Sequence, residues 1–163
     1  MLSFLHLNSF KFYNLILLFV FSTITNSFYS IEWLHPIFYC FFHLLLIYLA
    51  IYHYTKLLYP IYFLYGLALD IYLLNEIGPH LLSFILSLFL INLYSKYLYN
   101  LTSLKVYILI IILLLIMILF EFSFSNLVFN LDFKTKYYFK LILISTTISF
   151  PVFLLFSKID KFK

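Results

Sequence analysis

The sequence predicts an all-α, polytopic integral membrane protein that forms a single bundle of six transmembrane helices. Hydrophobic residues make up 66% of its 163 residues, charged residues only 10%, and the mean hydropathy is +1.09. Soluble domains are about 45–50% apolar and about 25% charged, so a water-soluble fold of this size could not bury so much apolar surface. Charged residues and prolines also divide the chain into six apolar runs that are long enough to cross a bilayer.

The six predicted spans follow one another with short connections. They cover about residues 12–28, 37–54, 57–74, 79–99, 104–124 and 137–156. Short connections predict that consecutive spans pack as antiparallel neighbours, and they leave no room for a soluble domain. Pro36, Pro60 and Pro79 fall in the first turns of the second, third and fourth spans, where a missing N–H costs nothing. Pro151 falls inside the sixth span and should kink it.

The lysines predict the orientation in the membrane. The formal net charge is +4, and all ten basic residues are Lys. With the N-terminus inside, seven lysines face the cytoplasm and three, Lys134, Lys136 and Lys140, share one external loop. This bias favours cytoplasmic termini, and it indicates that the lysines orient the spans rather than bind nucleic acid. Lys11 and the apolar run after it resemble a signal peptide, but without an A-x-A cleavage site they favour an uncleaved first helix.

Two acidic residues, Asp70 and Glu121, lie inside apolar spans. Such a group costs about 2.5–3.5 kcal/mol on insertion scales, so it normally faces other helices rather than lipid. Gly66 lies four residues before Asp70, so both residues occupy one helix face, which predicts close approach to a neighbouring helix and a polar contact with it. The cost of Asp70 also makes the third span marginal on its own, which predicts a place in the bundle interior.

The role of the two acids stays open at this point. Both are expected in the outer half of the membrane, where they could share one polar pocket, and the lack of an intramembrane Lys predicts no ion pair. Each acid could bond a neighbouring helix or reach the outer interface. The alternatives are a proton or substrate pathway and a contact with a partner protein.

The remaining side chains provide no recognisable enzyme or cofactor motif. The five histidines form no H-x-x-x-H or H-E-x-x-H pair, and His43 in the second span predicts a helix–helix hydrogen bond rather than a metal site. A single cysteine, Cys40, excludes an internal disulfide and a multi-thiolate metal site. There is no G-x-S-x-G elbow or glycine-rich phosphate loop. We therefore expect no cofactor, no metal and no enzymatic activity.

Several short motifs resemble a known family. His35-Pro36 opens the second span, Gly66-Leu67-Ala68-Leu69-Asp70 lies in the third, and Ile77-Gly78 precedes the fourth. In order, spacing, helix count and length, the chain resembles the bacterial rod shape-determining protein MreD family, as does Pro151 followed by a basic end. Two features depart from the family. All basic residues are Lys where other members often have Arg, and His35 replaces the family's Arg before the proline.

The resemblance implies a scaffold component of the cell-elongation machinery in the bacterial inner membrane. It implies association with MreC and, through it, with MreB, the elongation-specific penicillin-binding transpeptidase and the glycan polymerase. The candidate residues for helix packing or partner contact are Pro36, Gly66, Asp70, Gly78, Glu121 and Pro151. The alternative is the substrate-binding subunit of an energy-coupling-factor transporter. Such a subunit needs a solute pocket lined by several polar side chains and a small-residue face, and the scarcity of Gly and Ala disfavours the latter.

Overall fold

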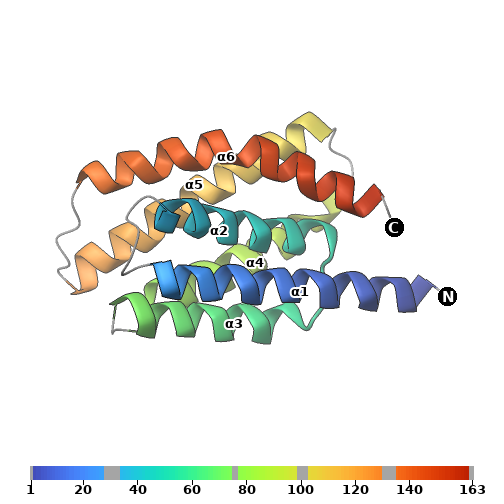
Figure 1. Cartoon of the computed structure of the whole chain (residues 1–163), viewed down its shortest axis with the longest axis horizontal. Coiled ribbons are helices and arrows are strands. Elements are labelled where there is room, and N and C mark those ends of the chain that lie inside the picture. Colours follow the sequence, from blue (N-terminus) through green and yellow to red (C-terminus); the bar gives the residue numbers. More distant parts are fainter. Residues whose placement is uncertain (1, 28–33, 75–76, 99–102, 130–134, 162–163) are drawn as a thin grey trace.

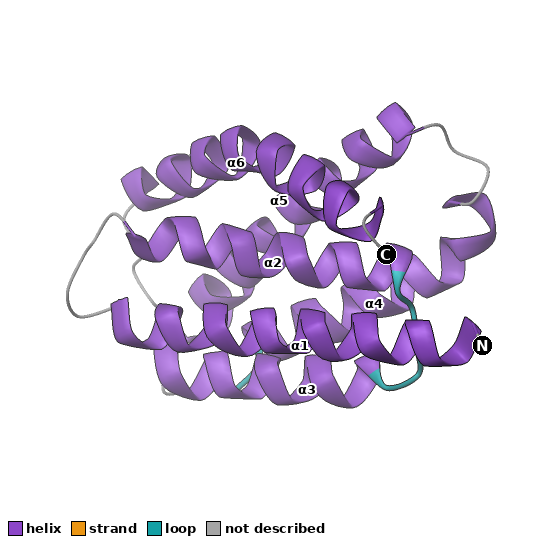
Figure 2. Ribbon diagram, turned by 45° about the vertical axis from the view of Figure 1, so that its right-hand side comes forward, coloured by secondary structure: helices purple, strands orange, loops and turns teal. Residues whose placement is uncertain are grey.

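The computed structural model is an all-helical bundle (Figures 1 and 2) and describes residues 2–27, 34–74, 77–98, 103–129 and 135–161. Lys134, assigned above to the external loop, lies outside these ranges. The helices are α1 (Leu2–Ser27), α2 (Leu34–Tyr52), α3 (Leu58–Leu69), the π-helical turn η1 (Asp70–Leu74), α4 (Pro79–Leu98), α5 (Ser103–Phe129) and α6 (Thr135–Lys161). The start of α1 and the end of α6 lie at the same end of the bundle (Figure 1).

Three of these helices are long and apolar enough to cross a membrane. They are α2, residues Leu104–Val128 of α5 and residues Phe139–Lys158 of α6. Shorter apolar segments cover Phe12–Thr25, Leu58–Leu74 and Pro79–Tyr94. The prediction of an all-α protein with helices suited to a membrane is confirmed at this level, whereas the crossing of all six spans stays a prediction.

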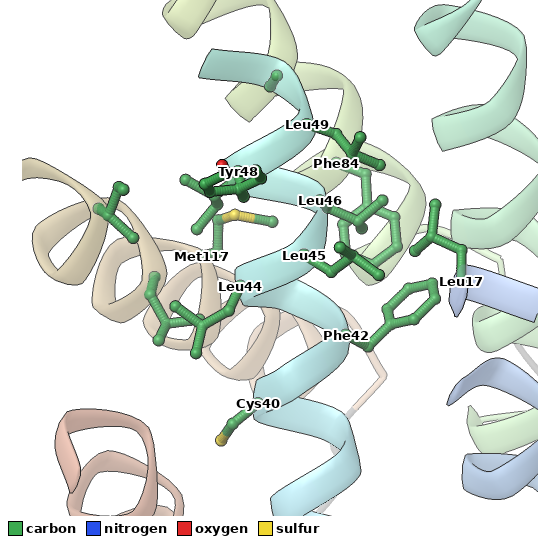
Figure 3. Close-up of a cluster of buried hydrophobic side chains, with 14 of the residues drawn as sticks. Leu17, Cys40, Phe42, Leu44, Leu45, Leu46, Tyr48, Leu49, Phe84 and Met117 are labelled. Atoms are coloured by element: carbon green, nitrogen blue, oxygen red, sulfur yellow. The ribbon is translucent and has the colours of Figure 1, made fainter. Parts of the chain in front are cut away.

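Helix α2 forms the centre of the bundle. Every side chain from residue 42 to residue 50 is buried. These side chains leave α2 on different sides and meet Leu17 of α1, Phe84 of α4 and Met117 of α5 (Figure 3). A helix that is apolar around its whole circumference must be covered by neighbouring helices or by lipid, and in this bundle neighbouring helices cover most of α2.

Helix α3, by contrast, buries only one face, and its expected place in the interior is therefore wrong. Its buried residues include Tyr62, Gly66 and Leu69, while Leu64 is 62% exposed and Phe63 is also exposed. The expectation assumed that Asp70 needs helices around the whole segment. The structure meets that need locally, because the start of α4 supplies the polar groups that Asp70 requires, as described below.

The prolines lie where the sequence predicts. Pro36 and Pro60 are the third residues of α2 and α3, and Pro79 is the first residue of α4. Pro151 lies inside α6, which continues through it with a bowed course (Figure 2). A proline in the first turn removes no helical hydrogen bond, so the first three positions fix where helices begin.

Candidate functional site

Asp70 lies where α3 passes into the π-helical turn η1, and its side chain points at the first turn of α4. Its carboxylate accepts hydrogen bonds from three backbone N–H groups. Oδ2 accepts from Gly78 at 2.9 Å and from Leu81 at 3.1 Å, and Oδ1 accepts from His80 at 2.9 Å. Asp70 is completely buried. A residue of one helix therefore caps the next helix along the chain.

This contact accounts for all the N–H groups that a helix leaves unpaired at its start. An α-helix has four such groups, here at Gly78, Pro79, His80 and Leu81. Proline has no N–H, and Asp70 accepts the other three. The next N–H, of Leu82, donates to the Gly78 carbonyl at 2.9 Å and begins the helical ladder. The negative charge also lies at the positive end of the α4 dipole, which offsets the cost of its burial.

The two glycines of the motif allow this junction to form. A Cβ atom built on Gly66 would lie 2.6 Å from Cα and 3.0 Å from N of Leu81, so a larger residue would collide with the backbone of α4. Gly78 has a φ of 154°, a conformation that residues with a side chain rarely adopt. Gly66 and Asp70, which the sequence places on one face of a helix, thus both contact the first turn of α4.

The second buried acid, Glu121, joins α5 to α2. The Tyr39 hydroxyl donates to Oε2 of Glu121 at 2.5 Å. Nε2 of His43 lies 3.0 Å from Oε1 and 3.1 Å from Oε2 of the same carboxyl group. The other ring nitrogen of His43, Nδ1, donates to the backbone carbonyl of Tyr39 at 2.9 Å. Tyr39 and His43 are four residues apart, so one face of α2 presents both groups to Glu121.

One histidine connects the two acids. Nδ1 of His80 lies 2.8 Å from Oδ1 of Asp70, and its Nε2 lies 3.0 Å from the Tyr39 hydroxyl. The side chains of Asp70, His80, Tyr39, Glu121 and His43 therefore form one continuous series, which we call the buried polar chain. It joins η1, α4, α2 and α5, and each member is at most 7% exposed.

The structure also corrects the expectation that the acids take part in no ion pair. Asp70 and His80 are within salt-bridge distance at 2.8 Å, and so are Glu121 and His43 at 3.0 Å. The expectation considered only Lys as a partner inside the membrane. Histidine serves here because its two ring nitrogens can contact two groups at once.

The remaining candidate residues take no part in these hydrogen bonds. Pro36 is buried in the first turn of α2, one turn before Tyr39. Pro151 is exposed on α6. Sequence reasoning missed Tyr39, because tyrosine is abundant throughout the chain, and it missed His80 as a member of the motif. The available signals were the i,i+4 spacing of Tyr39 and His43 and the position of His80 two residues after Gly78.

The arrangement defines a class of site, namely a buried series of hydrogen-bonded polar side chains. Within the described ranges, no three His, Cys, Asp or Glu side chains group together as potential ligands of a metal ion. Comparison with protein-family models, curated proteins and solved structures finds no match. The fold and the site thus define an all-helical protein of apolar helices with a buried hydrogen-bonded acid–histidine–tyrosine series at one end.

Proposed function

We propose that this chain is a multi-pass scaffold of the MreD type in a bacterial inner membrane, with six crossing helices and both termini in the cytoplasm. The observation that carries the proposal is the junction between α3 and α4. The motif residues on which the resemblance rests, Gly66, Asp70 and Gly78, act there as one packing unit. A motif whose members are explained together by a helix junction suits a protein that works by holding helices in place.

The surfaces of α5 and α6 are the natural places for partners. Their apolar windows are only 33% and 28% buried, against 72% for α2. In a membrane, such faces contact lipid or the transmembrane helix of another protein. We propose that MreC binds there, and that the bundle links it to MreB, the elongation-specific transpeptidase and the glycan polymerase. The role is one of association and includes no reaction.

The engagement of the buried acids supports a scaffold over a solute transporter. Asp70 accepts three backbone hydrogen bonds and contacts His80, while Glu121 contacts Tyr39 and His43. A solute would have to displace contacts within the protein to reach either carboxylate. Polar groups that serve a solute pocket are expected to converge on an open space instead.

Depletion of the protein in its own cell tests the proposal. Rod-shaped cells should become round, and the protein should copurify with MreC from mild detergent. A complementing copy with Gly66→Leu should fail to restore the rod, because the larger side chain separates α3 from α4, whereas Leu64→Ala at an exposed site of α3 should restore it. A tightly bound vitamin, an ATPase module as the copurifying partner and unchanged cell shape would instead identify a transporter subunit.

A further inference from the structure

The hydrogen bonds of the buried polar chain require a definite number of protons. Four contacts join its five side chains, and each needs one hydrogen between two electronegative atoms. One other hydrogen is already assigned. Nδ1 of His43 faces a backbone carbonyl, which can only accept, so this nitrogen carries a hydrogen and Nε2 carries a second one only if the ring is charged.

The five side chains do not own enough hydrogens in their ordinary ionisation states. With both carboxyl groups ionised and both imidazoles neutral, they hold three: one on each ring and one on Tyr39. Because His43 uses its own on the carbonyl, two remain for four contacts, and the net charge is −2. With Tyr39 donating to Glu121 and Nδ1 of His80 donating to Asp70, the two empty contacts are His80–Tyr39 and His43–Glu121, where lone pairs would face each other at 3.0–3.1 Å inside an apolar interior.

Two additional protons resolve both the lack of hydrogens and the net negative charge. They supply a hydrogen to every contact and bring the net charge to zero. This count does not depend on which atom of a contact holds the hydrogen. At Asp70 the position is clear, because three backbone N–H groups already stabilise the ionised carboxylate, so the hydrogen of that contact lies on Nδ1 of His80.

We propose that the buried polar chain is a proton-binding site that holds two protons beyond this reference state and takes them up from water at one end of the bundle. Each uptake adds one H⁺ from water and forms no other bond. The bound protons join α4 and α5 to α2, so proton loss loosens these helices.

The position of the buried polar chain indicates the end of the bundle from which protons enter. Its members come from the first half of α2, η1, the start of α4 and the last third of α5, and these parts lie at the end of the bundle opposite the termini (Figure 1). His80, in the first turn of α4, is 5% exposed. Beyond His43, residues 44–50 of α2 are buried and consist of six aliphatic residues and Tyr48. This apolar segment favours a site open on one side over a path across the whole membrane.

Other titratable groups lie on the helices around the buried polar chain. Experiments must distinguish the titration of these groups from that of the buried polar chain. His35 stacks on Tyr39 with ring centroids 6.0 Å apart, and the thiol of Cys40, the residue after Tyr39, donates to the Leu141 carbonyl of α6 at 3.7 Å. Helix α3 contributes Tyr62, whose ring packs on Phe84. On α6, Lys140 is the titratable residue that precedes Leu141 in the sequence.

The pH dependence of unfolding counts the bound protons. Above about pH 7, histidine in the unfolded chain is neutral, so a folded state with two extra protons loses stability as the pH rises. Each proton contributes about a tenfold change in the folding equilibrium constant per pH unit. In lipid–detergent micelles unfolded by a denaturing detergent, we expect the wild-type constant to fall by up to about a hundredfold per unit.

Glu121→Gln is the matched variant. Its amide donates permanently to Nε2 of His43 and accepts from Tyr39, so it replaces one exchangeable proton without a change of shape. We expect the folding equilibrium constant of this variant to fall by only about tenfold per pH unit. His53→Gln, at the other end of α2 and outside the buried polar chain, should keep the wild-type pH dependence of the folding equilibrium constant. Equal slopes for the wild type and Glu121→Gln would overturn the proposal.

A measurement on the wild type keeps the proposal testable if Glu121→Gln does not fold. Solid-state NMR of protein with ¹⁵N-labelled histidine reports which ring nitrogens carry hydrogen, and infrared spectroscopy reports protonated carboxyl groups. We expect His80 and His43 both to be doubly protonated at neutral pH, or one of the two rings to be neutral with Glu121 protonated in its place. Neutral rings together with ionised carboxylates would leave contacts without hydrogen and would refute the inference.

Discussion

Oδ1 of Asp70 lies 2.8 Å from Nδ1 of His80, and the same oxygen accepts the backbone N–H of His80. One residue of α4 is therefore held twice by one carboxylate, through its backbone and through its ring. This double contact ties the start of α4 to the end of α3, and it also fixes the His80 ring so that Nε2 meets Tyr39. The helix junction and the buried polar chain consequently share Asp70 as their common element.

Substitution of Asp70 should reveal its capping role. Asp70→Asn keeps one acceptor oxygen but turns an amide nitrogen toward backbone N–H groups, so at least one of these buried groups loses its partner. Each unpaired group costs about 1–3 kcal/mol. Asp70→Leu removes both acceptors and should cost more. Although an amide can still bond one neighbour, the three backbone N–H donors make Asp70→Asn substantially destabilising.

Equilibrium unfolding and the amount of protein in the membrane measure these two variants. The order should be wild type, then Asn, then Leu. An Asn variant as stable as the wild type would contradict the capping role. If both variants were equally stable but equally inactive in cells, Asp70 would act by carrying a proton rather than by holding α4.

Gly66→Ala should separate α3 from α4. The new Cβ would lie 2.6 Å from Cα of Leu81, and because this is a backbone atom, no side-chain rotation can relieve the collision. Overpacking of this kind costs about 1–3 kcal/mol, and the shift also lengthens the bonds from Asp70 to α4. Thermal unfolding in detergent should show a lower midpoint for Gly66→Ala. Leu64→Ala, at a site 62% exposed on the same helix, is the control and should change the midpoint little.

The sequence predicts the helices well because their cause is local, and it predicts the polar contacts poorly because theirs is not. Apolar runs and prolines define where helices begin, and the i,i+4 spacing places Gly66 and Asp70 on one face. The identity of their neighbour depends on how helices are arranged in space. The contact between Tyr39 and Glu121 joins residues 82 positions apart, and no local pattern indicates it. The same reason explains why the third span was wrongly expected in the bundle interior.

The orientation of the chain is testable with fusions. The start of α1 and the end of α6 lie at one end of the bundle (Figure 1), and the lysine distribution favours the cytoplasm for that end. A reporter that is active only outside the cytoplasm should give no signal when fused after Lys163. A cytoplasmic reporter at the same position should be active and serves as the control. A strong external signal would reject the model of six spans with both termini inside.

Tyr39→Phe tests whether the two halves of the buried polar chain are coupled. The hydroxyl donates to Glu121 and contacts Nε2 of His80, so its removal leaves both groups with one partner fewer. We expect a loss of about 1–3 kcal/mol, because buried polar groups without a partner carry the full cost of their desolvation. Tyr94→Phe, at an exposed tyrosine, should change stability by less than about 0.5 kcal/mol.

A double-mutant cycle of Tyr39→Phe with Glu121→Gln then measures the coupling itself. Because the hydroxyl and the carboxyl group are in direct contact, the cost of both changes should differ from the sum of the single costs by about 0.5–3 kcal/mol. A second cycle pairs Tyr39→Phe with Leu64→Ala on α3, a residue outside the network, and should be additive within about 0.5 kcal/mol. Additive costs in the first cycle would show that Tyr39 and Glu121 stabilise the bundle independently. The buried polar chain would then divide at that contact into a group of three, Asp70, His80 and Tyr39, and the pair of Glu121 and His43.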